Sequence, residues 1–98
     1  MTACADHVFT MAEADLKRAY GAVKARLDDQ ALEQLKAAQR AWTAYRHEWC
    51  DFIARPWRGG SIYPMIHAQC LTELTEAQTE KLWAQSGCEE GDLFCTGG

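Results

Sequence analysis

Apolar side chains recur at every third or fourth position along three long segments of this sequence, and short breaks separate the segments. Such spacing gathers apolar residues on one face of an α-helix. The three segments cover residues 5–29, 30–54 and 62–86. The pattern predicts an all-α fold, either a three-helix antiparallel bundle or a helical hairpin with a third packed helix.

Each predicted helix has an apolar stripe that we expect to face the core. The stripe of the first helix consists of Phe9, Ala12, Leu16, Tyr20, Val23 and Leu27. The stripe of the second consists of Leu32, Leu35, Trp42, Tyr45, Trp49 and Phe52, with Gln39 as a polar member. The stripe of the third consists of Met65 or Ile66, Cys70, Leu74, Ala77 and Leu82. We therefore expect the aromatic rings of the second helix to be buried.

The breaks between the predicted helices carry residues that end or cap a helix. Asp28 and Asp29 separate the first two helices and offer an N-cap for the second. Pro56 ends the second helix, because the residue before a proline disfavours helical geometry. Ser61 is the expected N-cap of the third helix, and Gly87 is its expected C-cap.

Composition excludes several classes of protein. The 98 residues suit a single domain over residues 1–98. The net charge of -4 argues against general nucleic-acid binding, which needs a basic surface. No segment approaches the run of about 18 apolar residues that a membrane-spanning helix needs. No phosphate-binding loop, metalloprotease motif or catalytic triad is recognisable, so we expect neither an enzyme nor a cofactor.

The cysteines indicate the compartment. The chain has five of them and no Cys-x-x-Cys motif. The spacings of Cys50 with Cys70 and of Cys88 with Cys95 suit disulfides, which predict a periplasmic or secreted protein. Cys4 is then left over, and the sequence shows no apolar signal segment at its start.

A zinc site is the alternative for two of these cysteines. His47 precedes Cys50 by three positions, and His67 precedes Cys70 by the same spacing, so the four residues have the composition of a zinc site. In an antiparallel helix pair, however, the two histidines are displaced in opposite directions, which separates their Cα atoms by roughly 9 Å along the axis. We therefore favour the Cys50–Cys70 disulfide and expect no metal.

Arg40 and Arg46 lie among the aromatic residues of the second predicted helix. Arginine beside tryptophan can indicate stacking on nucleic-acid bases, but the acidic net charge argues against that use here. We expect both arginines, and Gln39 with them, to have structural roles, with the arginines paired to carboxylates. The expected carboxylate partners are those of Glu48, Glu73 and Glu76.

Several motifs lie along the predicted helices and in the turn before the third helix. They consist of Lys36, Gln39, Arg40, Trp42, Tyr45, Arg46 and Cys50, then Gly59, Gly60, Ser61 and Pro64, then Cys70, Leu71, Leu74 and Thr75. Asp15, Leu16 and Tyr20 in the first segment and the tail at residues 88–95 extend the pattern. Together these residues resemble the LprI N-terminal domain family of bacterial periplasmic proteins and lipoproteins, some of which inhibit lysozyme.

The resemblance is to the short single-domain form of the family, and it implies a periplasmic helical domain. It also implies that this sequence starts inside the family pattern, so that the signal peptide, a first family segment and the partner of Cys4 either lie upstream or are absent from this version of the protein. The chain departs from the family pattern at His47, where aspartate is frequent, and at Gln78, where arginine is frequent. If those two residues form a salt bridge in relatives, this chain has replaced both of its ends.

The resemblance makes a lysozyme or a related cell-wall hydrolase the expected partner. Animal-type lysozymes are cationic, so an acidic inhibitor would gain association rate from complementary charge. The expected binding residues are those of the turn before the third helix, namely Trp57, Gly59, Gly60, Ser61 and Tyr63. The alternative is a cell-envelope module that binds a peptide, a protein or peptidoglycan without inhibiting an enzyme. The sequence leaves the oligomeric state open.

Overall fold

The computed structural model of the chain describes residues 2–87. Over these residues the fold consists of α1 (Thr2–Lys24), α2 (Asp29–Ala54), the short 3₁₀-helix η1 (Arg55–Trp57) and α3 (Tyr63–Ser86). No strand occurs among them, and the predicted all-α fold is confirmed. The predicted Cys88–Cys95 disulfide lies outside the described residues.

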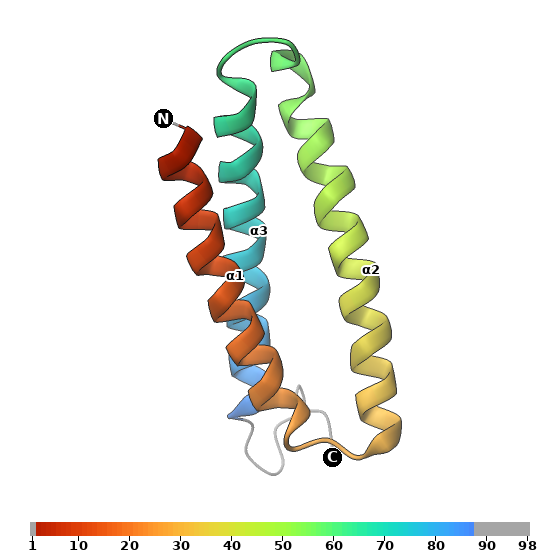
Figure 1. Cartoon of the computed structure of the whole chain (residues 1–98). Coiled ribbons are helices and arrows are strands. Elements are labelled where there is room, and N and C mark those ends of the chain that lie inside the picture. The colour runs from red at the N-terminus through yellow and green to blue at the C-terminus, as the bar shows by residue number, and fades with distance from the viewer. Residues whose placement is uncertain (1, 88–98) are drawn as a thin grey trace.

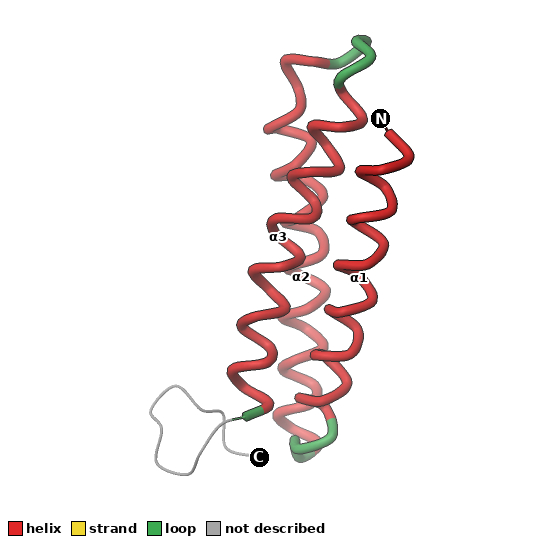
Figure 2. The backbone as a smooth tube through the Cα atoms, turned by 90° about the vertical axis from the view of Figure 1, so that its left-hand side faces the viewer, coloured by secondary structure: helices red, strands yellow, loops and turns green. Residues whose placement is uncertain are grey.

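The three α-helices lie side by side in an elongated bundle (Figure 1). The chain runs down α1, up α2 and down α3, so α2 is antiparallel to the other two, and α1 runs parallel to α3. Figure 2 shows the same arrangement from the side, with the turn between α2 and α3 at one end of the bundle. Both α1 and α2 pack mainly against α3, which makes α3 the helix shared by the two interfaces.

The main core lies between α1 and α3. Leu16, Ala19 and Val23 of α1 and Leu82 of α3 form a buried cluster. Of the stripe predicted for the first helix, Ala12, Leu16 and Val23 are buried, and the other three members are half-buried. Ala19 has no exposed surface, because its small side chain lets the two helices approach closely. The half-buried apolar residues that pack around this cluster are Tyr20, Leu27, Leu35 and Trp42.

The buried face of α3 differs from its predicted stripe. Thr72, Thr75 and Thr79 are buried, whereas Leu74 is half-buried and Ala77 is exposed. The hydroxyls of Thr75 and Thr79 each donate a hydrogen bond to the carbonyl four residues earlier, at 2.6 and 2.8 Å, so their burial leaves no donor unpaired. Cys70 and Leu82 are buried as predicted. The predicted stripe was wrong at Ala77 and omitted the threonines, because α3 is covered by α1 on one side and by α2 on another.

The aromatic residues of α2 also depart from expectation. Tyr45, Trp49 and Phe52 have exposed fractions of 51%, 40% and 56%, so the expectation that these rings belong to the core was wrong. The buried residues of α2 are Cys50 and Ala54. The physical reason is that α1 packs against α3 and leaves this side of α2 uncovered.

Two of the predicted helix caps are confirmed, whereas the predicted end of α1 and the predicted N-cap of α3 are wrong. The Asp28 carboxylate caps α2 by accepting a 2.8 Å hydrogen bond from the backbone N–H of Ala31, and Gly87 is the C-cap of α3, as predicted. α1 ends at Lys24, five residues before its predicted end at residue 29. Ser61 does not cap α3, because the N-cap residue is Ile62 and it makes no side-chain capping bond.

Candidate binding surface

The turn between α2 and α3, which we call the tip, comprises residues 55–63 and closes one end of the bundle (Figure 1). Its backbone is folded by local hydrogen bonds. The N–H of Gly60 donates to the carbonyl of Trp57 at 3.0 Å, and the N–H of Tyr63 donates to the carbonyl of Gly60 at 3.3 Å. Gly59 has φ +82°, a left-handed conformation that glycine adopts without steric cost.

A disulfide holds the two helices together just below the tip. Cys50 of α2 is bonded to Cys70 of α3, with the Cα atoms 5.6 Å apart, which confirms the predicted pairing. The bond uses both thiols, so the alternative zinc site was wrong. Because Cys50 is fully buried, the cross-link fixes the end of α2 against α3 from inside the interface.

Polar and aromatic contacts reinforce the base of the tip. His67 Nε2 lies 3.0 Å from Asp51 Oδ1, which links α3 to α2 one turn from the disulfide. His47 Nε2 lies 3.3 Å from the other oxygen of the same carboxylate. Tyr63 stacks on the His67 ring at 5.6 Å between centroids. The disulfide and these contacts hold both ends of the turn in place, which limits the conformations that the turn can adopt.

The predicted binding residues lie together on the tip, but not all are equally accessible. Trp57 is 42% exposed, and Gly59, Gly60 and Ser61 are exposed as well. Tyr63 is half-buried, because its ring lies against His67. The turn thus presents an indole, a hydroxyl and backbone polar groups to solvent.

The tip is locally basic although the chain is acidic. Arg55 and Arg58 are both exposed. No aspartate or glutamate occurs between Phe52 and Thr72 in the sequence. In the part of the chain that the structure describes, no carboxylate forms a salt bridge with either arginine. The tip therefore presents guanidinium groups that can pair with a carboxylate on a partner.

Of the residues predicted to be structural, Gln39 and Arg46 are half-buried and Arg40 is exposed. Arg46 Nη1 lies 2.5 Å from Glu13 Oε1 of α1 and 2.9 Å from Thr75 Oγ1 of α3. Gln39 accepts a 3.0 Å hydrogen bond from the side-chain amide of Gln78. The expected partners of Arg46 were wrong, because its carboxylate comes from α1 and not from α2 or α3. Arg40 is exposed and has no carboxylate partner among the described residues.

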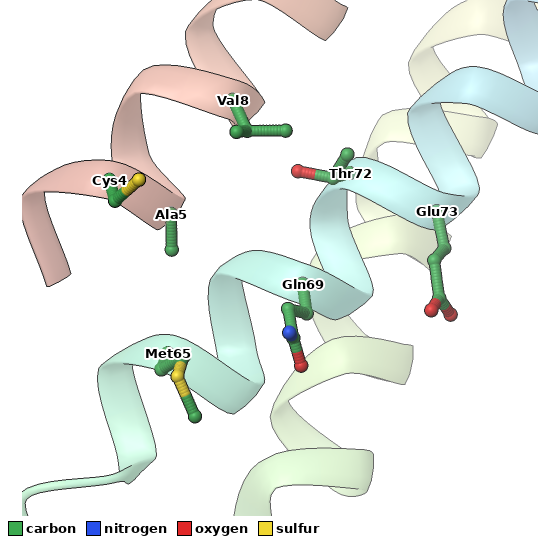
Figure 3. A pocket seen from close by; sticks show the side chains of 7 residues that line it. All are labelled: Cys4, Ala5, Val8, Met65, Gln69, Thr72 and Glu73. Atoms are coloured by element: carbon green, nitrogen blue, oxygen red, sulfur yellow. The ribbon is translucent and has the colours of Figure 1, made fainter. Parts of the chain in front are cut away.

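A shallow hollow of about 530 Å³ lies between the N-terminal parts of α1 and α3 and is lined by Cys4, Ala5 and Val8 of α1 and by Met65, Gln69, Thr72 and Glu73 of α3 (Figure 3). Its lining is mainly apolar and holds one carboxylate, that of Glu73. Cys4 has a free, exposed thiol. Within residues 2–87 no group of three or more histidine, cysteine or acidic side chains is placed to hold a metal ion. In the same range no helix has the length and apolarity to cross a membrane.

Comparison with known proteins decides the family. The model of the lysozyme inhibitor LprI family matches residues 1–82, which include α1, α2, the tip and most of α3. The chain belongs to the LprI family. A relative in Rhizobium meliloti (strain 1021), described as an uncharacterised protein, is 38% identical over 92 aligned residues. That match covers 81% of this chain and 66% of the relative, just under two thirds of its length. No solved structure matches this LprI-family chain.

The range that matches the LprI family model, residues 1–82, includes the whole tip. The family model also spans the disulfide and the half-buried Arg46 contacts. His47 and Gln78, where this chain departs from the pattern expected for the family, do not contact each other through any hydrogen bond or ion pair in the described structure. His47 lies near Asp51, and Gln78 bonds Gln39.

Proposed function

We propose that this protein is a binding protein that inhibits a lysozyme or a related cell-wall hydrolase, in the periplasm or outside the cell. Its membership of the LprI family is the observation that carries this proposal. The Cys50–Cys70 disulfide supports an oxidising compartment, since such bonds are rare in the cytosol. In this proposal the protein acts by binding and has no catalytic role of its own.

The tip is the proposed contact with the enzyme's active site. Glycoside hydrolases of this kind use a pair of carboxyl groups in a cleft. The exposed guanidinium of Arg58 can bind such a carboxylate through two parallel hydrogen bonds, and Ser61 adds a hydroxyl. The disulfide and the Asp51–His67 contact hold the turn before it binds, which lowers the conformational entropy lost on association.

Charge supports the approach of the two proteins. The chain has a net charge of -4, so it attracts a cationic lysozyme as a whole, while the basic tip suits the acidic cleft. Because exposed charges are screened by salt, we expect inhibition to weaken between low and moderate ionic strength.

The test is a titration of the protein into c-type lysozyme acting on bacterial cell walls. Wild-type protein should inhibit saturably at a defined stoichiometry. We expect Arg58→Gln, and separately Ser61→Ala with Tyr63→Phe, to raise the inhibition constant about tenfold or more, as for central interface residues. Arg18→Gln is the matched control, because Arg18 is an exposed arginine on α1, outside the tip.

The outcomes distinguish an error in the proposed function from an error in the proposed contact surface. No inhibition by a monodisperse, correctly oxidised wild-type sample would overturn the proposed function. Inhibition that survives both tip variants would retain the function but move the contact elsewhere on the molecule.

The exposure of Trp57 favours one further candidate, a cell-envelope module that binds a peptide, a protein or peptidoglycan without inhibiting a hydrolase. Tryptophan and arginine are frequent anchors of interfaces, and Arg58 follows Trp57 directly. Binding of purified peptidoglycan that is lost in Trp57→Ala, with no effect on lysozyme, would select this candidate.

A further inference from the structure

Four exposed residues of α2 form a continuous surface that the tip does not include. Tyr45 precedes Glu48 by three positions and Trp49 by four, and Phe52 follows these two by four and three, which places all four residues on one face of the helix. We call this surface the aromatic face. It starts near the middle of α2 and ends next to the tip, because Arg55 of the tip lies over the Phe52 ring at 6.0 Å.

The rings of the aromatic face contact one another. Tyr45 stacks on Trp49 with 6.1 Å between the ring centroids, and Trp49 lies 5.6 Å from Phe52. These contacts restrict the side-chain rotamers in the free protein. Binding a partner therefore costs less conformational entropy here than at flexible side chains of similar size.

The charges around the aromatic face favour a cationic partner. Among the described residues no cation pairs with the exposed Glu48 carboxylate. Two of the nearest cations along α2 point elsewhere: Arg46, only 12% exposed, is turned inward to Glu13, and His47 lies against Asp51. Arg55 lies over the Phe52 ring at the tip end of the face, so the part of the face that a partner's cation can approach is at Tyr45, Glu48 and Trp49. Aromatic ring faces and a free carboxylate both attract ammonium and guanidinium groups.

We propose that the aromatic face is a second contact surface of the inhibitor, which binds lysine and arginine side chains on the outside of the lysozyme while the tip occupies the cleft. This inference rests on the proposed function and extends it, because it names the surface and the partner chemistry. Its position supports it, since the face is continuous with the tip at Phe52 and Arg55. Tyrosine, tryptophan and phenylalanine are enriched in protein–protein interfaces, and tryptophan and tyrosine often contribute most of their binding energy.

The experiment is a calorimetric titration of c-type lysozyme with variants of the aromatic face. We expect Trp49→Ala with Phe52→Ala to raise the Kd about tenfold or more. Glu48→Lys should raise the Kd at low salt and lose this effect at high salt, because it replaces an attractive charge with a repulsive one. All three positions are exposed, so the helical content by circular dichroism should stay at the wild-type value.

Two matched controls lie on α3. Trp83 is 46% exposed and lies in the last turn of α3. This end of α3 is at the opposite end of the bundle from the tip (Figure 1). Trp83→Ala should leave the Kd within about twofold of wild type, as expected for a surface tryptophan outside the interface. Glu80→Lys makes the same charge change as Glu48→Lys at another exposed glutamate and should have a smaller effect.

Each outcome supports or overturns the inference. If the wild type and the Trp49→Ala, Phe52→Ala variant bind lysozyme with the same Kd, the inference about the aromatic face is wrong and the proposed function still stands. Absence of wild-type binding overturns both. If the face instead mediates a concentration-dependent dimer by sedimentation, or peptidoglycan binding, and lysozyme binding does not depend on it, the inference is wrong and the inhibition assay alone decides the function.

Discussion

At the scale of single residues, Arg46 connects all three helices. It projects from α2, pairs with Glu13 of α1 and reaches Thr75 of α3. Its guanidinium also lies over the Trp42 ring at 4.7 Å and the Phe9 ring at 5.3 Å. A group enclosed in this way is stabilised by its partners, and removal of either member of the ion pair leaves the other charge poorly compensated.

We expect Arg46→Ala to lower the free energy of unfolding by about 2–3 kcal/mol, because Glu13 and Thr75 lose their partner. Urea unfolding followed by circular dichroism measures this change. Glu13→Ala should cost less in the Arg46→Ala background than in the wild type, since the two residues are coupled. Arg18→Ala, which removes an exposed pair with Asp15, should leave the stability nearly unchanged. Equal losses for Arg46→Ala and Arg18→Ala would contradict this role.

At the scale of the helix, α2 and α3 begin in different ways. The carboxylate of Asp28 satisfies one of the free N–H groups at the start of α2. At the start of α3, no side chain caps the helix, and Pro64 lies in the first turn, where its missing N–H costs nothing. The two ends therefore provide a comparison of a capped and an uncapped helix within one molecule.

We expect Asp28→Ala to destabilise the protein by about 1 kcal/mol, the usual contribution of an N-cap side chain. Ser61→Ala should leave the stability unchanged, because Ser61 makes no capping bond in this structure. Thermal unfolding of both variants is the measurement. A loss in Ser61→Ala as large as that in Asp28→Ala would show that the serine caps α3 after all, and its effect on inhibition would then reflect folding.

At the scale of the whole molecule, a covalent cross-link holds α2 against α3, together with the polar contacts of Gln39, Arg46 and Asp51. α1 and α3 share a long apolar interface, whereas the buried residues of α2 are only Cys50 and Ala54. The disulfide compensates for this small apolar contact. The same bond joins α2 and α3 directly below the tip, which is the proposed contact surface.

We expect Cys50→Ala with Cys70→Ala to lower the free energy of unfolding by about 3 kcal/mol, on the chain-entropy estimate for a loop of this length. The inhibition constant should rise as well, because the tip loses its restraint. Cys4→Ser is the control, since Cys4 is free and exposed. Unchanged inhibition in a folded double variant would show that the restraint does not matter for binding.

The sequence alone determined the elements of this protein. Periodic apolar residues predicted three helices, and the second and third lie within one residue of their predicted bounds. Asp28 and Gly87 cap the helix ends next to them in the sequence. The Cys50–Cys70 disulfide could be predicted because a short turn brings the ends of two consecutive helices together. These features depend on neighbours along the chain, which a sequence displays directly.

Only the tertiary structure decided which helix faces are covered. The spacing of Tyr45, Trp49 and Phe52 places them on one face, but burial depends on whether a second helix lies over that face. Because α1 pairs with α3, the rings remain exposed, and the carboxylate partner of Arg46 comes from Glu13, 33 residues away in the sequence. Periodicity describes one helix at a time, whereas burial and long-range pairing depend on the relative positions of all three.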